Sequence, residues 1–127
     1  MVQGIDSARL ELLRNNFESI ADEMALTVHR TSRSAVVRTS HDFSTGLLSP
    51  LGELVAQGIS NPGHLGGMAP ALQSCLTWFE GRVYPGDILI NNDPYEGGSH
   101  LPDIFVFKPL FDGDTLIAWL CTMSHHT

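Results

Sequence analysis

The sequence predicts an α+β fold with one long N-terminal helix, a second, shorter helix and mainly antiparallel β-hairpins. Apolar residues recur at steps of three and four over residues 6–30 and again over residues 68–79, as on one face of a helix. Elsewhere, short apolar runs come in pairs around turn-forming residues at 49–52 and at Asp112 and Gly113. A chain of 127 residues has the length of one domain, so we expect residues 1–127 to form a single domain.

The long helix is expected to run from Asp6 to about residue 30. Its apolar stripe consists of Leu10, Leu13, Phe17, Ile20, Met24 and Val28. Asp6 or Ser7 can cap its start. The stripe is interpreted as facing the core or another subunit. Residues 31–40, rich in hydroxyls and arginine, are interpreted as a connector with room for a short strand at residues 35–37.

The middle of the chain alternates apolar runs with turn signals. Residues 43–48 and 53–59 are expected to form a hairpin, and residues 61–67, with three glycines and a proline, a loop. The second helix is expected over residues 68–79. The sequence Tyr-Pro-Gly-Asp at 84–87 predicts a type II turn, followed by a strand over residues 87–91.

The last hairpin is expected to join residues 104–111 to residues 115–123 through Asp112 and Gly113, since Asp-Gly between apolar runs is a strong hairpin signal. A two-residue loop would place His100 opposite His125, and a three-residue loop would place it opposite His126. Either register folds the polar segment before the hairpin onto the histidines that follow it.

Composition excludes several function classes. The net charge is −7 and the seven Lys and Arg residues are scattered, which argues against a nucleic-acid partner. No apolar stretch approaches the ~18 residues of a membrane span, and the polar start argues against a secretory signal. Cys75 and Cys121 lie in apolar runs and are expected to be buried free thiols, which suits a cytoplasmic protein.

A metal site is predicted where the polar segment at residues 91–103 meets the end of the hairpin. His100 and Asp103 are three residues apart, and both can reach one ion only from a turn, which Pro102 supplies. Adding His125 or His126 gives two imidazoles and a carboxylate, a set that suits Zn, Fe or Mn and leaves coordination positions open. The alternative is that His100 and Asp103 are solvated loop residues and the terminal histidines are frayed.

Other polar residues are further candidates. The adjacent His41 and Asp42 are either an acid–base or orienting pair, or a simple turn. His64 either approaches a ligand from its glycine-rich loop or caps the next helix. The residues expected to position substrate or to orient ligands, rather than form a plain turn, are Asn92, Asp93 and Tyr95.

Nucleotide binding is not expected of this chain. It contains no G-x-x-x-x-G-K motif and no strand followed by G-x-G-x-x-G. If the reaction uses ATP, these 127 residues do not show the means to bind it.

The run N-D-P-Y-E-G-G-S-H-L-P-D at residues 92–103 resembles the N-D-P-Y-x-G-G-[ST]-H-x-x-D signature of the hydantoinase B/oxoprolinase family. That family also contains the alpha subunits of acetone and acetophenone carboxylases. Further matching blocks, in the expected order, are residues 41–44 with 52–57, 64–66, 85–87 and 124–127. The last block looks like the family's His-His pair, which normally continues into Asp and Gly-Gly. The resemblance covers nearly the whole chain.

This resemblance implies a cytoplasmic, multisubunit amidohydrolase such as N-methylhydantoinase or 5-oxoprolinase. The B-type part would complete ring-opening of a cyclic amide or imide after a hydantoinase A-like partner, using ATP and Mg, phosphorylates a substrate oxygen. In the carboxylase branch the alpha subunit joins an activated ketone to activated bicarbonate. Family members have several hundred residues, so the chain is interpreted as an N-terminal fragment of such a subunit, and we expect an oligomer.

The family's metal set, carried over by motif, is His100, Asp103 and His125. His126 or His41 would then be acid–base groups, with Asn92 and Asp93 orienting the loop. Two alternatives stay open: the carboxylase alpha subunit, and a non-catalytic assembly module in which the His/Asp loop is only structural.

Overall fold

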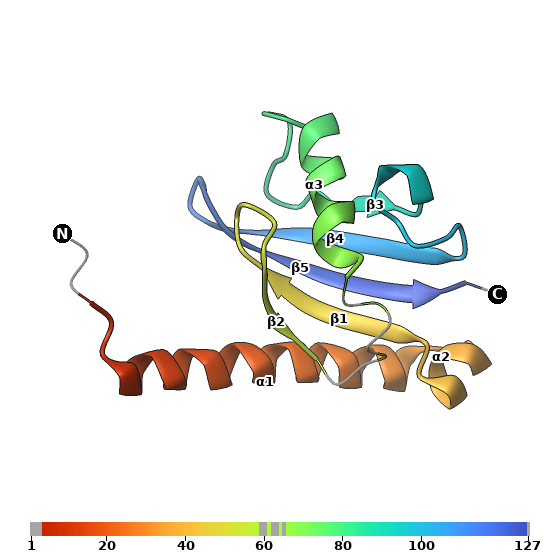
Figure 1. The fold of residues 1–127 in the computed structure, drawn as a ribbon, viewed down its shortest axis with the longest axis horizontal. Helices are drawn as coiled ribbons and strands as arrows, with labels where there is room; N and C mark the ends of the chain where they lie inside the picture. Colours follow the sequence, from red (N-terminus) through yellow and green to blue (C-terminus); the bar gives the residue numbers. More distant parts are fainter. Residues whose placement is uncertain (1–3, 59–60, 62–63, 65, 127) are drawn as a thin grey trace.

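The computed structural model describes residues 4–58, 61, 64 and 66–126. Within these ranges the strands form one antiparallel five-stranded sheet in the order β2-β1-β5-β4-β3 (Figure 1). The strands are β1 Phe43–Leu48, β2 Leu54–Gln57, β3 Leu89–Asn91, β4 Asp103–Asp112 and β5 Thr115–His125. The α+β prediction is confirmed. Residue 59 of the expected second strand, and residues 62, 63 and 65 of the expected loop, lie outside the described residues.

Helices lie on both sides of the sheet. Helix α1 (Ser7–Thr31) runs along β1 and β2, and α3 (Met68–Trp78) lies on the other side, near β3 and β4 (Figure 1). Asp6 caps α1, since its side chain accepts a hydrogen bond from the Ala8 amide at 3.3 Å. None of the helices in the described ranges is both long and apolar enough to span a membrane.

The α1 face against the sheet is narrower than the predicted stripe. Its buried residues are Ala21 and Ala25, whereas Leu10 and Ile20 remain exposed. The small alanines allow close approach to β1, where the Thr45 hydroxyl donates to the Ala21 carbonyl at 2.8 Å. The stripe therefore indicated the helix correctly but not which of its residues would be buried.

The short strand considered at residues 35–37 is wrong, because these residues begin helix α2 (Ala35–Ser40). Ser34 caps this helix by accepting from the Val37 amide at 3.5 Å. Val37 is buried in a small cluster with Ala25 and Phe43. Capping and this tertiary contact override the strand preference of two adjacent valines.

The main core lies between the sheet and α3. Its buried members are Leu48, Met68, Ala71, Leu72, Cys75, Leu89, Phe105, Phe107, Trp119, Cys121 and Met123. Cys75 and Cys121 are free and buried, as expected. The predicted turn at 84–87 is also present, with Gly86 at φ 94° and a hydrogen bond from the Asp87 amide to the Tyr84 carbonyl.

The β4–β5 register differs from the prediction. Asp112 pairs with Thr115, so the turn residues are Gly113 and Asp114 rather than Asp112 and Gly113. Gly113 has φ 57° and takes the first central position, where type II′ turns prefer glycine. Because of this shift and a bulge between Leu110 and Phe111, Asp103, not His100, lies opposite His125.

Candidate metal centre

The segment between β3 and β4 is held in shape by its own side chains. Asp93 accepts from the Tyr95 amide through its carboxylate at 2.9 Å and begins the short 3-10 helix η2 (Pro94–Glu96). Gly97 then takes φ 87° and lies so near α3 that an added Cβ would be 2.5 Å from the Pro70 carbonyl carbon. A glycine is therefore required for the loop to pack on the helix.

Two amide side chains tie the ends of this segment together. Asn91 donates to the carbonyls of Ala71 and Glu96, at 3.2 and 2.8 Å, and accepts from the Asp93 amide at 2.9 Å. Asn92 donates to the Leu101 carbonyl at 2.8 Å. Asn91 was not among the predicted site residues, although its place at the end of a strand before Asn-Asp-Pro was a usable signal.

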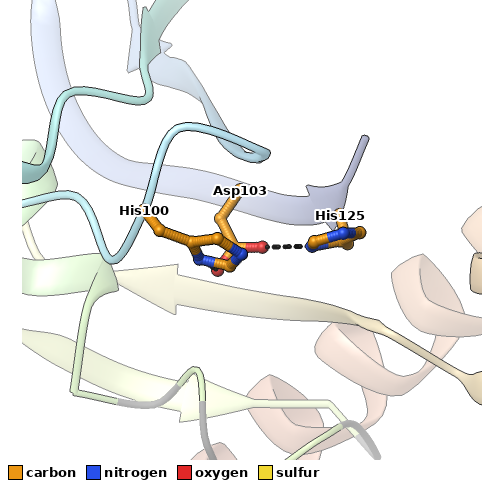
Figure 2. A group of neighbouring side chains, drawn as sticks. All are labelled: His100, Asp103 and His125. Carbon is orange, nitrogen blue, oxygen red and sulfur yellow. Dashed lines mark hydrogen bonds and ion pairs between the residues drawn. The ribbon is translucent and has the colours of Figure 1, made fainter. Parts of the chain in front are cut away.

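Asp103 lies at the centre of the candidate site (Figure 2). Its Oδ2 is 2.9 Å from His100 Nδ1, and its Oδ1 is 3.0 Å from His125 Nδ1. The Ser99 hydroxyl also donates to Oδ2. A turn brings His100 into place, since its carbonyl accepts from the Asp103 amide at 2.9 Å, and the strand register brings His125.

Burial differs sharply across this cluster. The Asp103 side chain is 3% exposed, that of His125 26% and that of His100 53%. Desolvation by burial alone would raise the pKa of Asp103, but hydrogen bonds from Ser99 and His125, together with the positive potential of His100, lower it overall. The carboxylate is thus held in its charged form with one side of the cluster open to solvent.

The donor set fits a divalent metal. His100, Asp103 and His125 each offer one ligand atom, and these atoms all lie within 4.8 Å of one another. Two imidazoles and one carboxylate form a ligand set that zinc and other first-row metals accept with positions left for water or substrate. Ligand identity, closeness and an open side all agree with such a centre.

A second chain of polar contacts adjoins this cluster. His64 Nε2 is 3.0 Å from Asp42 Oδ1, and its Nδ1 is 2.9 Å from the buried Ser44 hydroxyl. Asp42 Oδ2 is 3.8 Å from His125 Nδ1. Asp42 and His64, both predicted candidates, therefore lie beside the triad. Ser44 was not predicted, because a serine inside a strand gives no signal that separates a buried hydrogen-bonding role from an ordinary one.

The remaining predicted residues, His41, Tyr95 and His126, do not belong to the triad. His41 adopts φ 52° and its ring stacks on His29, with centroids 5.0 Å apart. Tyr95 is 96% exposed. His126 lines, with His125, a cavity of about 320 Å³ between α2 and strands β4 and β5.

Comparisons with known proteins agree on one family. The profile of the hydantoinase B/oxoprolinase family matches residues 6–127. The beta subunit of caprolactamase from Pseudomonas jessenii is 36% identical over 97% of this chain, which covers 21% of that subunit. 5-Oxoprolinase 1 of Arabidopsis thaliana is 39% identical over 95% of this chain, which covers 10% of that protein.

Solved structures show the same fold. The crystal structure of ATP-dependent caprolactamase from Pseudomonas jessenii matches 98% of this chain with a TM-score of 0.89 and 35% identity, over 22% of its own chain. The nucleotide-free structure of acetone carboxylase matches 93% of this chain with a TM-score of 0.81, over 16% of its own chain. At 23% identity, that second likeness shows the fold alone. This chain thus spans about a fifth of the caprolactamase subunit and a tenth of the oxoprolinase.

Proposed function

Because the chain belongs to the hydantoinase B/oxoprolinase family, we propose that it is the metal-bearing part of an ATP-dependent amidohydrolase acting on a small cyclic amide or imide. The names caprolactamase and 5-oxoprolinase denote hydrolases of such rings. The observation that carries the proposal is the buried Asp103 carboxylate between His100 and His125.

His100, Asp103 and His125 would hold the metal, which we propose to be Zn, Mn or Fe. When bound, the metal would polarise a carbonyl oxygen or lower the pKa of a water molecule. Asp103 orients both imidazoles through its two oxygens, at 2.9 and 3.0 Å. His100, the most exposed of the three, leaves the centre accessible to a small substrate.

Acid–base work is proposed for Asp42, His126 and His41. Asp42 has the strongest support, because its carboxylate is 3.8 Å from His125 Nδ1. His126 follows His125 in sequence and lines the adjoining cavity. For His41 to take part, its ring must leave the stack on His29.

The polar segment before β4 is proposed to orient the site and to meet the substrate. Asn92 fixes the backbone just after His100 through its bond to the Leu101 carbonyl. Asp93 acts through the loop, as the cap of η2. Tyr95 is fully available to a ligand or to a neighbouring polypeptide.

We further propose a cytoplasmic complex with a hydantoinase A-like subunit that binds ATP and Mg. The sequence carries no phosphate-binding motif of its own. The relative from Pseudomonas jessenii is named as a subunit, which supports a multisubunit assembly.

Metal analysis of the purified chain tests the site. Wild type should bind an equimolar divalent metal, and His100→Ala should lose it while keeping its circular dichroism spectrum. His126→Ala is the matched control, because it removes a neighbouring histidine outside the triad and should retain the metal. A wild type that binds no metal contradicts the proposal.

Activity of the assembled complex tests the reaction. With a hydantoinase A-like subunit present, ATP hydrolysis should depend on a cyclic amide such as 5-oxoproline or caprolactam. Dependence on a ketone and bicarbonate instead would assign the carboxylase reaction. A complex that binds metal yet hydrolyses ATP with neither substrate class would contradict both.

A further inference from the structure

We propose that Ser44 and His64 are positioning residues that hold the Asp42 carboxylate beside His125 Nδ1 and so strengthen metal binding at this site. The inference rests on the proposed metal site and deepens it. It assigns a role to a buried serine that the reaction itself does not use. It also explains why a histidine from the 61–67 region meets the start of β1.

Strand alternation places these groups on one face of the sheet. Ser44 pairs with Met123, which belongs to the core beneath α3, so Ser44 points to the α3 side. His125 is two residues after Met123 and pairs with Asp103, and both therefore point to that same side. The Ser44 hydroxyl and the side chains of Asp103 and His125 therefore lie on the same face of the sheet.

The backbone of Asp42 is fixed independently of its side chain. Its carbonyl accepts from the His125 amide at 3.1 Å. The carboxylate is 28% exposed, so without a partner it is free to rotate towards water. His64 Nε2, 3.0 Å from Oδ1, holds one oxygen and leaves Oδ2 directed at His125 Nδ1, 3.8 Å away.

His64 is in turn held through its second ring nitrogen. The Ser44 hydroxyl, 0% exposed, lies 2.9 Å from His64 Nδ1 and 3.3 Å from the Asn61 carbonyl. With a neutral ring, Ser44 donates to Nδ1. With a charged ring, Nδ1 donates to Ser44, which donates to Asn61. In both states Nε2 carries the proton that binds Asp42.

Nδ1 of His125 consequently faces two carboxylates, with Asp103 Oδ1 at 3.0 Å and Asp42 Oδ2 at 3.8 Å. Residues that position the groups around a metal site change metal affinity by roughly 10–100-fold when removed. We therefore expect the Ser44–His64 pair to act on metal affinity, although neither residue belongs to the triad. A residue that merely tethers the loop would change stability alone.

Three variants test this role: His64→Ala, His64→Gln and Ser44→Ala. Zinc affinity is measured by competition with a chelating dye, and the visible spectrum of the Co²⁺-loaded protein reports ligand geometry. His64→Ala should weaken zinc binding about 10–100-fold and alter the Co²⁺ bands. His64→Gln should keep the wild-type zinc affinity and Co²⁺ bands, because its amide can donate to Asp42 in place of Nε2. The zinc affinity of Ser44→Ala should lie between those of His64→Ala and wild type.

Ser74→Ala is the matched control. It removes a hydroxyl–carboxylate hydrogen bond of 2.5 Å to Glu96, away from the triad. It should lower the melting temperature without changing zinc affinity.

Two results would overturn this inference without affecting the proposed function. One is a wild-type zinc affinity and Co²⁺ spectrum in His64→Ala. The other is a His64→Gln variant that binds zinc as weakly as His64→Ala. If His64→Ala does not fold, Ser44→Ala and His64→Gln still decide the matter through the same two readouts. Absence of metal from the wild-type protein would instead overturn the proposed function together with the inference.

Discussion

Replacing Asp103 by asparagine removes the charge on which Ser99, His100 and His125 converge while keeping the size of the side chain. The amide can present its oxygen to only one side of the cluster. With that oxygen at the Oδ2 position, it still accepts from Ser99 and His100. The amide NH₂ then faces His125 Nδ1, where the carboxylate accepted a hydrogen bond at 3.0 Å.

The expected loss follows from these contacts. A hydrogen bond to a charged group contributes about 1.5–3 kcal/mol and a neutral one about 1 kcal/mol. The variant loses the hydrogen bond to His125, and its bonds to Ser99 and His100 no longer involve a charged acceptor. The bond to His100 contributes least to stability, because His100 is exposed. We therefore expect Asp103→Asn to lower the free energy of unfolding by about 2–4 kcal/mol in the absence of metal.

The loss should depend on pH in a defined direction. The folded-state pKa of Asp103 is lowered, so its contribution to stability is complete above the unfolded value, about 3.9, and disappears as pH falls through the folded value. The stability difference between wild type and Asp103→Asn should thus be largest near neutrality and should shrink on acidification.

Urea unfolding followed by circular dichroism, with a chelator present and at several pH values between neutrality and acid, measures this difference. Asp114→Asn, an exposed acid in the β4–β5 turn, serves as the control and should change stability by less than about 0.5 kcal/mol. A loss below about 1 kcal/mol at neutral pH, or a difference that does not shrink on acidification, would show that the Asp103 charge does not stabilise the fold as expected.

Three further predictions concern the fold. Gly97→Ala should destabilise by about 2–4 kcal/mol in thermal unfolding, because φ is 87° and the new Cβ would overlap the Pro70 backbone. Gly113→Ala should cost only about 1–2 kcal/mol, since its φ is also positive but nothing lies within 4 Å; equal losses for the two variants would contradict this account. Cys75 and Cys121 should resist alkylation until the protein unfolds, because burial raises both thiol pKa values. Rapid labelling of the native protein would contradict this protection.

Local chemistry made much of the fold predictable from sequence. The α1 cap at Asp6 and the turn at Gly86 depend on neighbouring residues, and both are present. The helix at residues 35–40 was missed because Val37 is buried against Ala25 of α1 and Phe43 of β1, contacts that the pattern of residues 35–37 does not show. Tertiary contacts of this kind override the preference of a short segment.

For the candidate site, motif spacing indicated three residues that the structure brings close together, but not how the chain does so. A turn displaced by one residue and a bulge put Asp103, rather than His100, opposite His125. His100 still reaches the cluster, because it lies in the turn that precedes the strand. The contact of Ser44 with His64 joins two residues 20 positions apart, which no local pattern encodes.

Anomalous diffraction from zinc-loaded crystals, recorded on both sides of the zinc absorption edge, tests the metal centre most directly. We predict an anomalous peak bounded by His100, Asp103 and His125 in wild type, and its loss in Asp103→Asn. A wild-type map with no peak at these residues, or with zinc bound only elsewhere on the chain, would contradict it.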